Sequence, residues 1–260
     1  MKSGDVIVIG SGAAGFAAAV TACCKGLSVL MLEKAPHFGG TSAISGGAVW
    51  INDTDQARNL GKSGSPEAMK TYLRAIIGEA NYRPDMIDAF VHAGREALAF
   101  LEQEGAVKYS LRPLSPDYYP DEPGGVDVGR ALEVVEYDGR ELGQHFTTLR
   151  SPPPGMLLFG GMMVNRVDIQ HFLDMRRSWR SLAHCTKLLL RYGRDRLRHH
   201  RGTRLAMGTA PIVRMATMAL RKGLELALNV TGTSLAGQNG PVTRRAHVRD
   251  CLQLTSSVQR

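Results

Sequence analysis

The hexapeptide GSGAAG at residues 10–15 directly follows a short apolar run and opens a stretch rich in alanine. In a strand–turn–helix unit, Gly10 permits the tight turn, Gly12 lets the backbone approach a diphosphate, and Gly15 lets the helix pack closely on the strand. The helix N-terminus adds unpaired N–H groups and a partial positive charge. The spacing therefore predicts an anionic dinucleotide against these residues: Gly10, Ser11, Gly12, Ala13, Ala14 and Gly15.

Glu33 is the second residue with a predicted chemical role, since it ends the second expected strand, 18 residues after Gly15. A carboxylate at this position can accept hydrogen bonds from a ribose diol, and it repels a 2′-phosphate. The alternative interpretation is a βαβ unit whose glycines serve packing only. The two interpretations differ in whether a ligand lies against the turn.

The segment EKAPHFGGTSAISGGAVW, residues 33–50, favours a flavin over a nicotinamide cofactor. It places the glycine pairs Gly39-Gly40 and Gly46-Gly47 around small hydroxyl residues. Small residues leave room for a second pass of backbone along the diphosphate and the flavin, and hydroxyl and N–H groups act as donors. The hydroxyl residues are Thr41, Ser42 and Ser45.

This segment resembles flavoproteins of the fumarate reductase and 3-ketosteroid Δ1-dehydrogenase group, in which Glu-Lys, Gly-Gly-Thr and Ser-Gly-Gly recur in the same order. The resemblance is specific over residues 4–50 and continues with gaps to about residue 235. It implies that the cofactor is FAD, lined by Gly10, Gly12, Gly15, Glu33, Lys34, Gly39, Gly40, Thr41, Ser45, Gly46 and Gly47.

Three further segments, residues 115–125, 137–143 and 201–229, look like later landmarks of the steroid-dehydrogenase branch. In that branch a tyrosine after Pro-Asp contributes to the active site, and the matching residue is Tyr118. Tyr119 takes this place if the register slips by one residue. From the residues alone, the alternative is a loop anchor whose rings pack on the proline-rich segment.

The implied reaction removes two hydrogens from adjacent carbons beside a ketone, one as a hydride to the flavin and one as a proton to a base. A tyrosine that acts as a base at neutral pH needs its pKa lowered by about three units, which is roughly 4 kcal/mol. The expected substrate is a steroid ketone or a similar enone, with a fumarate-like dicarboxylate as the alternative. The sequence identifies no electron acceptor.

The chain is predicted to be α/β, with a Rossmann-like FAD/NAD(P)-binding domain of the three-layer ββα type over residues 1–235. An irregular excursion rich in proline and glycine is expected at about residues 107–205. The expected strands are residues 5–9, 27–33 and 224–228, the expected helices are residues 13–25, 66–77, 84–104 and 211–222, and a hairpin turn is expected at Asn239-Gly240.

A long basic helix is predicted around residues 176–204, where ten lysines or arginines accompany a single acid, Asp195. Its cations follow helical spacing beside an apolar stripe that includes Trp179 and Leu182, and Gly193 is a candidate break. An anionic membrane surface, nucleic acid and an acidic substrate are the functional interpretations, and a solvated helix face is the other. The scarcity of aromatic residues argues against nucleic acid.

Residues 236–260 are expected to be a divergent or truncated tail, because they lack the apolar strand and glycine-rich return of the family. We expect the substrate domain and the C-terminal FAD segment to be absent, and therefore weak FAD binding with slow or no turnover. A flavin fold without its closing segment exposes apolar surface and a sheet edge. The competing hypothesis is a non-catalytic module that binds through the basic helix.

Composition sets the remaining expectations. Hydrophobic residues are 43% and charged residues 22% of the 260, which is ordinary globular usage. The four cysteines form no CxxC pair and no cluster with zinc-ligand spacing, so we expect a reducing cytoplasm, no disulfide and no metal. No apolar run is long enough to cross a membrane, so any membrane contact would be peripheral.

Overall fold

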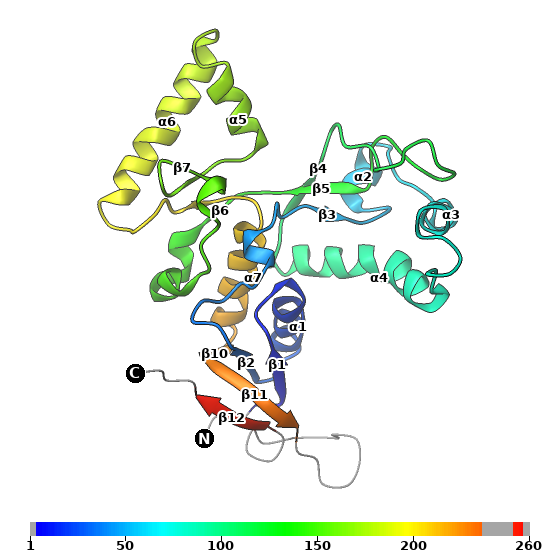
Figure 1. The fold of residues 1–260 in the computed structure, drawn as a ribbon, viewed down its shortest axis with the longest axis horizontal. Coiled ribbons are helices and arrows are strands. Elements are labelled where there is room, and N and C mark those ends of the chain that lie inside the picture. The colour runs from blue at the N-terminus through cyan, green and yellow to red at the C-terminus, as the bar shows by residue number, and fades with distance from the viewer. Residues whose placement is uncertain (1–3, 236–251, 257–260) are drawn as a thin grey trace. The chain divides into compact units, whose positions relative to one another are not determined.

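The computed structural model describes residues 4–235 and 252–256, so the expected turn at Asn239-Gly240 lies outside the described residues, as does Cys251. The chain divides into two compact units (Figure 1). Unit 1 comprises residues 1–47 and 136–260, and unit 2 comprises residues 48–135. The expected excursion at about residues 107–205 is therefore shared between the two units.

Unit 1 is built on a parallel sheet of three strands in the order β1-β2-β10. Strand β1 is Val6–Ile9, β2 is Val29–Glu33 and β10 is Glu225–Leu228. Every residue of β2 is buried, because this central strand is covered on both faces. A run of apolar residues without alternation is the pattern that such a strand needs.

Two helices of unit 1 pack against each other, α1 (Ala13–Cys24) and α7 (Thr209–Arg221), and α1 also packs on β1 and β2. The opposite side of the sheet buries Leu30 and Leu32 against Val230 of the next strand. That strand, β11 (Val230–Leu235), pairs antiparallel with β12 (Leu252–Ser256). Helices, parallel sheet and antiparallel ribbon form three layers, which confirms the predicted α/β fold of the ββα type.

The irregular parts of unit 1 contain the expected short strands and, in addition, 3₁₀ helices that the sequence does not predict. The 3₁₀ helices are η1 (Ser42–Ile44), η2 (Gly139–Thr148) and η3 (Pro154–Met156). Strand β6 (Tyr137–Asp138) pairs with β9 (Arg204–Leu205), and β7 (Leu157–Leu158) pairs with β8 (Met162–Met163).

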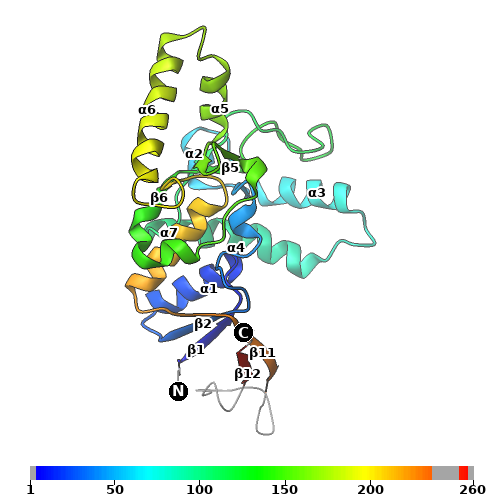
Figure 2. The ribbon, with the colours of Figure 1, turned by 60° about the vertical axis from the view of Figure 1, so that its left-hand side comes forward.

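The predicted basic helix is part of a helical hairpin that extends from the rest of unit 1 (Figures 1 and 2). Helix α5 (Arg166–Leu173) begins with a capping box between Asn165 and Asp168. Helix α6 (Trp179–Arg196) is N-capped by Ser178, whose hydroxyl accepts from the N–H of Ser181. Helix α6 is therefore shorter than the predicted helix at residues 176–204, since it begins at Trp179 and ends at Arg196, and Gly193 does not interrupt it.

Unit 2 contains an antiparallel sheet in the order β3-β5-β4 and three helices. Helix α3 has the bounds that the sequence predicts, because the hydroxyl of Ser65 caps it and Pro66 occupies its first position. The strands are β3 (Val49–Trp50), β4 (Tyr109–Leu111) and β5 (Ala131–Val134), and the helices are α2 (Asp55–Asn59), α3 (Pro66–Ile77) and α4 (Pro84–Gln103).

Among the described residues, no helix has the length and apolar character that a membrane span requires. No disulfide joins the three cysteines of this part of the chain, which are Cys23, Cys24 and Cys185.

Candidate functional site

The turn between β1 and α1 depends on two of the predicted glycines. Gly10 has a φ of +93°, a backbone conformation that side chains rarely adopt. A Cβ atom on Gly15 would lie 2.0 Å from the carbonyl oxygen of Gly10, so only glycine fits there. Helix α1 therefore begins directly against the end of β1.

The N-terminus of α1 carries the donors that an anion would need. Its N-cap, Gly12, provides no side-chain hydrogen bond, and its first turn contains no acid. The N–H of Ala13 donates to Ser42 Oγ at 3.0 Å, whereas the N–H groups of Ala14 and Gly15 have no acceptor among the described residues. Since Ala13 and Ala14 are exposed, a diphosphate could reach this helix end.

Ser11 and Glu33 lie together beneath the turn, and both are buried. Glu33 Oε2 accepts from the N–H of Ser11 at 3.0 Å and from its hydroxyl at 2.5 Å, and Oε1 accepts from the N–H of Ala35 at 2.9 Å. Ser11 Oγ also accepts from the N–H of Gly39 at 2.9 Å. Glu33 thus faces the glycine turn. Its carboxylate and the Ser11 hydroxyl together connect the backbone of the turn, of the residues after β2 and of the loop at Gly39.

These hydrogen bonds set the charge state of Glu33. Burial alone would raise the pKa of this carboxyl, but the hydrogen bonds from Ser11 and from the N–H groups of Ala35 and Lys34 outweigh it. The pKa of Glu33 therefore lies below its ordinary value, and the carboxylate is charged at neutral pH.

The second glycine loop lies against the first. A Cβ atom on Gly40 would be 3.4 Å from the Cα atom of Gly12, so the two backbones are in contact. Ser45 Oγ donates to the carbonyl of Ser42 at 2.8 Å and accepts from the N–H of Gly47 at 3.1 Å. Three other predicted cofactor residues, Lys34, Thr41 and Gly46, are exposed.

The N-terminus of α7 also borders this loop, and sequence reasoning missed it. The N–H of Gly208 donates to the carbonyl of Ser45 at 2.9 Å, and a Cβ on Gly208 would lie 1.9 Å from the carbonyl oxygen of Ser42. The helix was predicted from residue 211 but begins at Thr209. The sequence does carry a signal for the earlier start of this helix, since Gly208 can act as its N-cap and Pro211 lies in its first turn.

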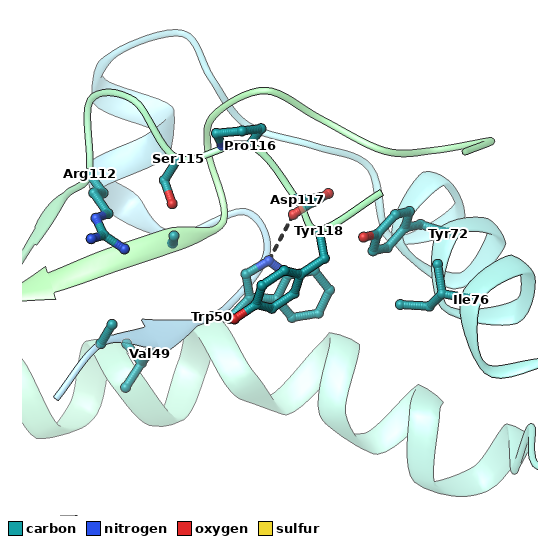
Figure 3. Close-up of a pocket in the computed structure, with 11 residues that line it drawn as sticks. Val49, Trp50, Tyr72, Ile76, Arg112, Ser115, Pro116, Asp117 and Tyr118 are labelled. Atoms are coloured by element: carbon teal, nitrogen blue, oxygen red, sulfur yellow. Dashed lines mark hydrogen bonds between the residues drawn. The ribbon is translucent and has the colours of Figure 1, made fainter. Parts of the chain in front are cut away.

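Unit 2 holds a pocket of about 530 Å³ that Tyr118 lines (Figure 3). This volume is in the range of small-molecule sites. Tyr118 is 97% exposed, and its side chain makes no hydrogen bond with the described residues. The Tyr119 side chain is not among the lining groups, although its N–H donates to the Tyr72 hydroxyl at 3.3 Å. The other lining residues are Ala48, Val49, Trp50, Tyr72, Ile76, Arg112, Ser115, Pro116, Asp117 and Ala131.

A buried ion pair holds the segment that carries Tyr118. Arg130 Nη1 and Asp117 Oδ2 lie 2.5 Å apart, and both side chains are 2% exposed. Asp117 also accepts from Trp50 Nε1 at 2.9 Å, the bond drawn in Figure 3, and from the N–H of Val126 at 3.1 Å. Burial lowers the pKa of Arg130, and the charge and hydrogen bond of Asp117 oppose this shift.

Arg112 is a lining residue that sequence reasoning did not identify. It follows β4 directly, and its head group points into the space beside Ser115 (Figure 3). Its Nε is buried and has no hydrogen-bond partner among the described residues. A guanidinium in a mostly apolar pocket can bind a carboxylate or a carbonyl oxygen of a ligand.

Comparison with known proteins identifies the family. The family described as "FAD binding domain" matches residues 5–251. The chain belongs to this family. FAD is therefore its cofactor, and the glycine turn, the open helix end and Gly46, where a Cβ would meet no atom within 4 Å, fit such a group.

Two proteins that resemble this chain over most of its length are dehydrogenases. The 3-oxosteroid 1-dehydrogenase of Mycobacterium tuberculosis is 35% identical over 254 residues, which are 97% of this chain and 44% of that protein. The 4-oxocyclohex-2-ene-1-carboxylate 5-dehydrogenase of Sinomonas cyclohexanicum is 34% identical over 92% of this chain and 40% of its own length. The chain therefore spans less than half of these relatives.

A solved structure supports the same assignment. The crystal structure of the 3-ketosteroid Δ1-dehydrogenase of Sterolibacterium denitrificans, in complex with 1,4-androstadiene-3,17-dione, superposes with a TM-score of 0.83 at 30% identity. The superposition covers 100% of this chain and 45% of that one. The predicted resemblance to flavoprotein dehydrogenases is confirmed.

Gly46→Leu tests whether the second glycine loop faces the cofactor. The added side chain meets open space, so we expect normal folding and FAD binding weakened at least about tenfold by steric exclusion. Fluorescence titration of the refolded apoprotein with FAD measures this. Gly155→Leu is the matched control, since Gly155 is also exposed and open, and equal affinities of the two variants would contradict this placement.

Glu33→Gln tests the charged hydrogen bonds beneath the turn. Because the pKa of Glu33 is lowered on folding, its contribution is present at neutral pH and is lost as the pH falls through the folded-state value. We expect a free energy of unfolding about 1–3 kcal/mol lower at pH 7. Urea denaturation should show this difference shrinking at acidic pH.

The control is Glu96→Gln, at an exposed position without these bonds, which should stay within about 0.5 kcal/mol of the original protein. A Glu33→Gln difference that grows on acidification would contradict the assignment of charge.

Asp117→Asn tests the ion pair that holds the Tyr118 segment. The substitution keeps the shape of the side chain but leaves the buried Arg130 guanidinium without its counter-charge. We expect the free energy of unfolding to fall by about 3–5 kcal/mol in urea denaturation. Asp127→Asn, at an exposed position of the same segment, is the control, and similar behaviour of the two variants would show that the pair does not stabilise unit 2.

Proposed function

We propose that this chain is the FAD-binding part of a dehydrogenase that acts on a cyclic ketone and introduces a double bond beside the carbonyl. The observation that carries the proposal is the pocket of about 530 Å³ with Tyr118 at its surface, in a chain 35% identical to a 3-oxosteroid 1-dehydrogenase. When bound, FAD accepts the hydride that leaves one carbon. Tyr118 is the proposed acceptor of the proton that leaves the adjacent carbon, although none of the described residues supplies the hydrogen-bond donors that its phenolate would need at neutral pH.

The residues of unit 1 serve the cofactor in this proposal. The N-terminus of α1 binds the diphosphate through the N–H groups of Ala14 and Gly15. The Glu33 carboxylate, at the end of β2, would accept a hydrogen bond from ribose. The loop 39–47, in which Gly40 contacts Gly12 of the first turn, would hold a further part of the cofactor. A cytoplasmic location stays a prediction.

The residues of unit 2 serve the substrate. Val49, Trp50 and Ile76 provide apolar surface for a ring system. The ion pair of Asp117 and Arg130 fixes the backbone next to Tyr118 and so presents the phenol to the pocket. A neutral steroid ketone is the substrate class that this apolar lining favours.

One experiment, with two variants, tests this function. The FAD-loaded protein is mixed without oxygen with a steroid 3-ketone, and bleaching of the visible flavin absorbance reports hydride transfer. Tyr118→Phe should slow bleaching by about 100-fold or more, because the proton acceptor is lost. Tyr119→Phe, a neighbouring tyrosine outside the pocket lining, should change the rate little. If the Tyr118→Phe variant bleached as fast as the Tyr119→Phe variant and the original protein, the proposed role of Tyr118 would be refuted.

Arg112 favours a second substrate class, a cyclic ketone that carries a carboxylate. Its Nε is buried without a partner among the described residues, and the Sinomonas relative is named for such a substrate. The guanidinium would bind the carboxylate by charge-assisted hydrogen bonds and position the ring against the remaining apolar lining. This class replaces the fumarate-like dicarboxylate as the better alternative.

Arg112→Met separates the two substrate classes. For a 4-oxocyclohexane carboxylate, kcat/KM should fall at least about tenfold, because a charge-assisted hydrogen bond is lost. For a neutral steroid ketone, the same substitution should leave kcat/KM nearly unchanged. Arg83→Met, at an exposed position of unit 2, is the control. An equal loss on both substrates would contradict a carboxylate-binding role for Arg112.

A further inference from the structure

The α5–α6 hairpin of unit 1 has a polar interior. Its buried residues are Asp168 of α5 and Ser181, Cys185 and Asp195 of α6. His184 Nε2 lies 2.8 Å from Asp168 Oδ1, and His171 Nδ1 lies 3.0 Å from Ser181 Oγ. Hydrogen bonds between polar side chains therefore join the two helices, where an ordinary helix pair would bury apolar side chains.

The apolar stripe of α6 faces outward instead. Leu190 and Leu197 follow Trp179 by about three and five helical turns, so these three side chains share one face. They are 71%, 84% and 80% exposed, respectively. Leu173 at the end of α5 is also exposed. This arrangement favours an interaction surface over a solvated helix face, because large apolar side chains are exposed together.

Cations lie along one side of the exposed stripe. At 100° per residue, Arg180, Lys187 and Arg194 lie about a sixth to a quarter of a turn from the face of Trp179, and Arg198 follows two residues after the end of α6. Arg176 and Arg177 lie in the turn between the helices, at the tip of the hairpin (Figures 1 and 2). Among the described residues, no acid forms a salt bridge with these six side chains.

We propose that the α5–α6 hairpin docks on an anionic lipid surface. Trp179, Leu190 and Leu197 enter the boundary between headgroups and acyl chains, and the flanking cations contact anionic headgroups. Long basic side chains beside an apolar stripe suit this boundary, because their stems lie along apolar surface while their charges stay at the headgroups. A nucleic acid would use the cations but leaves the apolar stripe without a role.

Vesicle binding by the complete chain tests the proposal. The protein is floated with vesicles of phosphatidylcholine alone or mixed with phosphatidylglycerol. We expect at least about tenfold tighter binding to the anionic vesicles, weakened by added salt. In a Trp50→Phe variant, Trp179 is the only tryptophan left, and its emission should shift to the blue on anionic vesicles. Vesicle binding is measured by flotation with the original chain, so this result does not depend on whether the Trp50→Phe variant folds.

Two groups of variants separate the apolar and the cationic contributions. Trp179→Ser with Leu190→Ser should weaken vesicle binding, as should Arg176→Glu with Arg180→Glu, each by at least about tenfold. The matched controls lie in unit 2 and should bind as the original chain does: Leu60→Ser with Leu114→Ser for the exposed leucines, and Lys62→Glu with Arg74→Glu for the charge.

Three outcomes would overturn the proposal. Equal binding to both kinds of vesicle would remove the role of the cations. Retention on heparin without vesicle binding would indicate nucleic acid as the partner. A dimer that the hairpin variants dissociate, measured by light scattering in the absence of vesicle binding, would show that a second copy of the chain covers this surface. Lipid docking needs neither flavin nor substrate, so these results do not depend on the proposed function.

Discussion

The hydroxyl of Ser11 is the point on which the cofactor end of unit 1 depends. It donates to Glu33 at the end of β2 and accepts from Gly39 in the second glycine loop. One small side chain thus fixes the distance between the first turn, the central strand and the loop that follows it. The Ser11 hydroxyl and the Glu33 carboxylate are both buried, so water does not compete for these hydrogen bonds. Loss of the hydroxyl would therefore separate the first turn from both the end of β2 and the loop at Gly39.

The sequence predicted the parts of the molecule in which local chemistry and packing agree. Strand β2, helix α1 and helix α3 lie close to their expected bounds, because an apolar run, a glycine turn and a Ser-Pro cap each act within a few residues. Ser11 was expected beside the cofactor, yet its side chain is directed to Glu33. Its glycine-rich neighbours indicated a ligand but could not indicate which hydroxyl would bind the protein itself.

The features that the sequence did not predict depend on contacts between distant residues. Arg112 and Trp50 line one pocket although 62 positions separate them, and no local pattern indicates that contact. The spacing of the cations predicts one helix around residues 176–204, but the helix begins only at Trp179, where Ser178 caps it, and ends at Arg196. The outward direction of Trp179 likewise follows from the polar pairing of Asp168 with His184, which only the folded hairpin creates.

The division of the chain has a consequence for its synthesis. Unit 2 is one continuous stretch, whereas unit 1 needs residues 1–47 and residues after 136. Strand β10 cannot pair with β2 until about residue 228 has left the ribosome, roughly ten seconds or more after β2 at ordinary elongation rates. During that interval the edge of β2 that later pairs with β10 stays open, although all residues of unit 2 have already been synthesised.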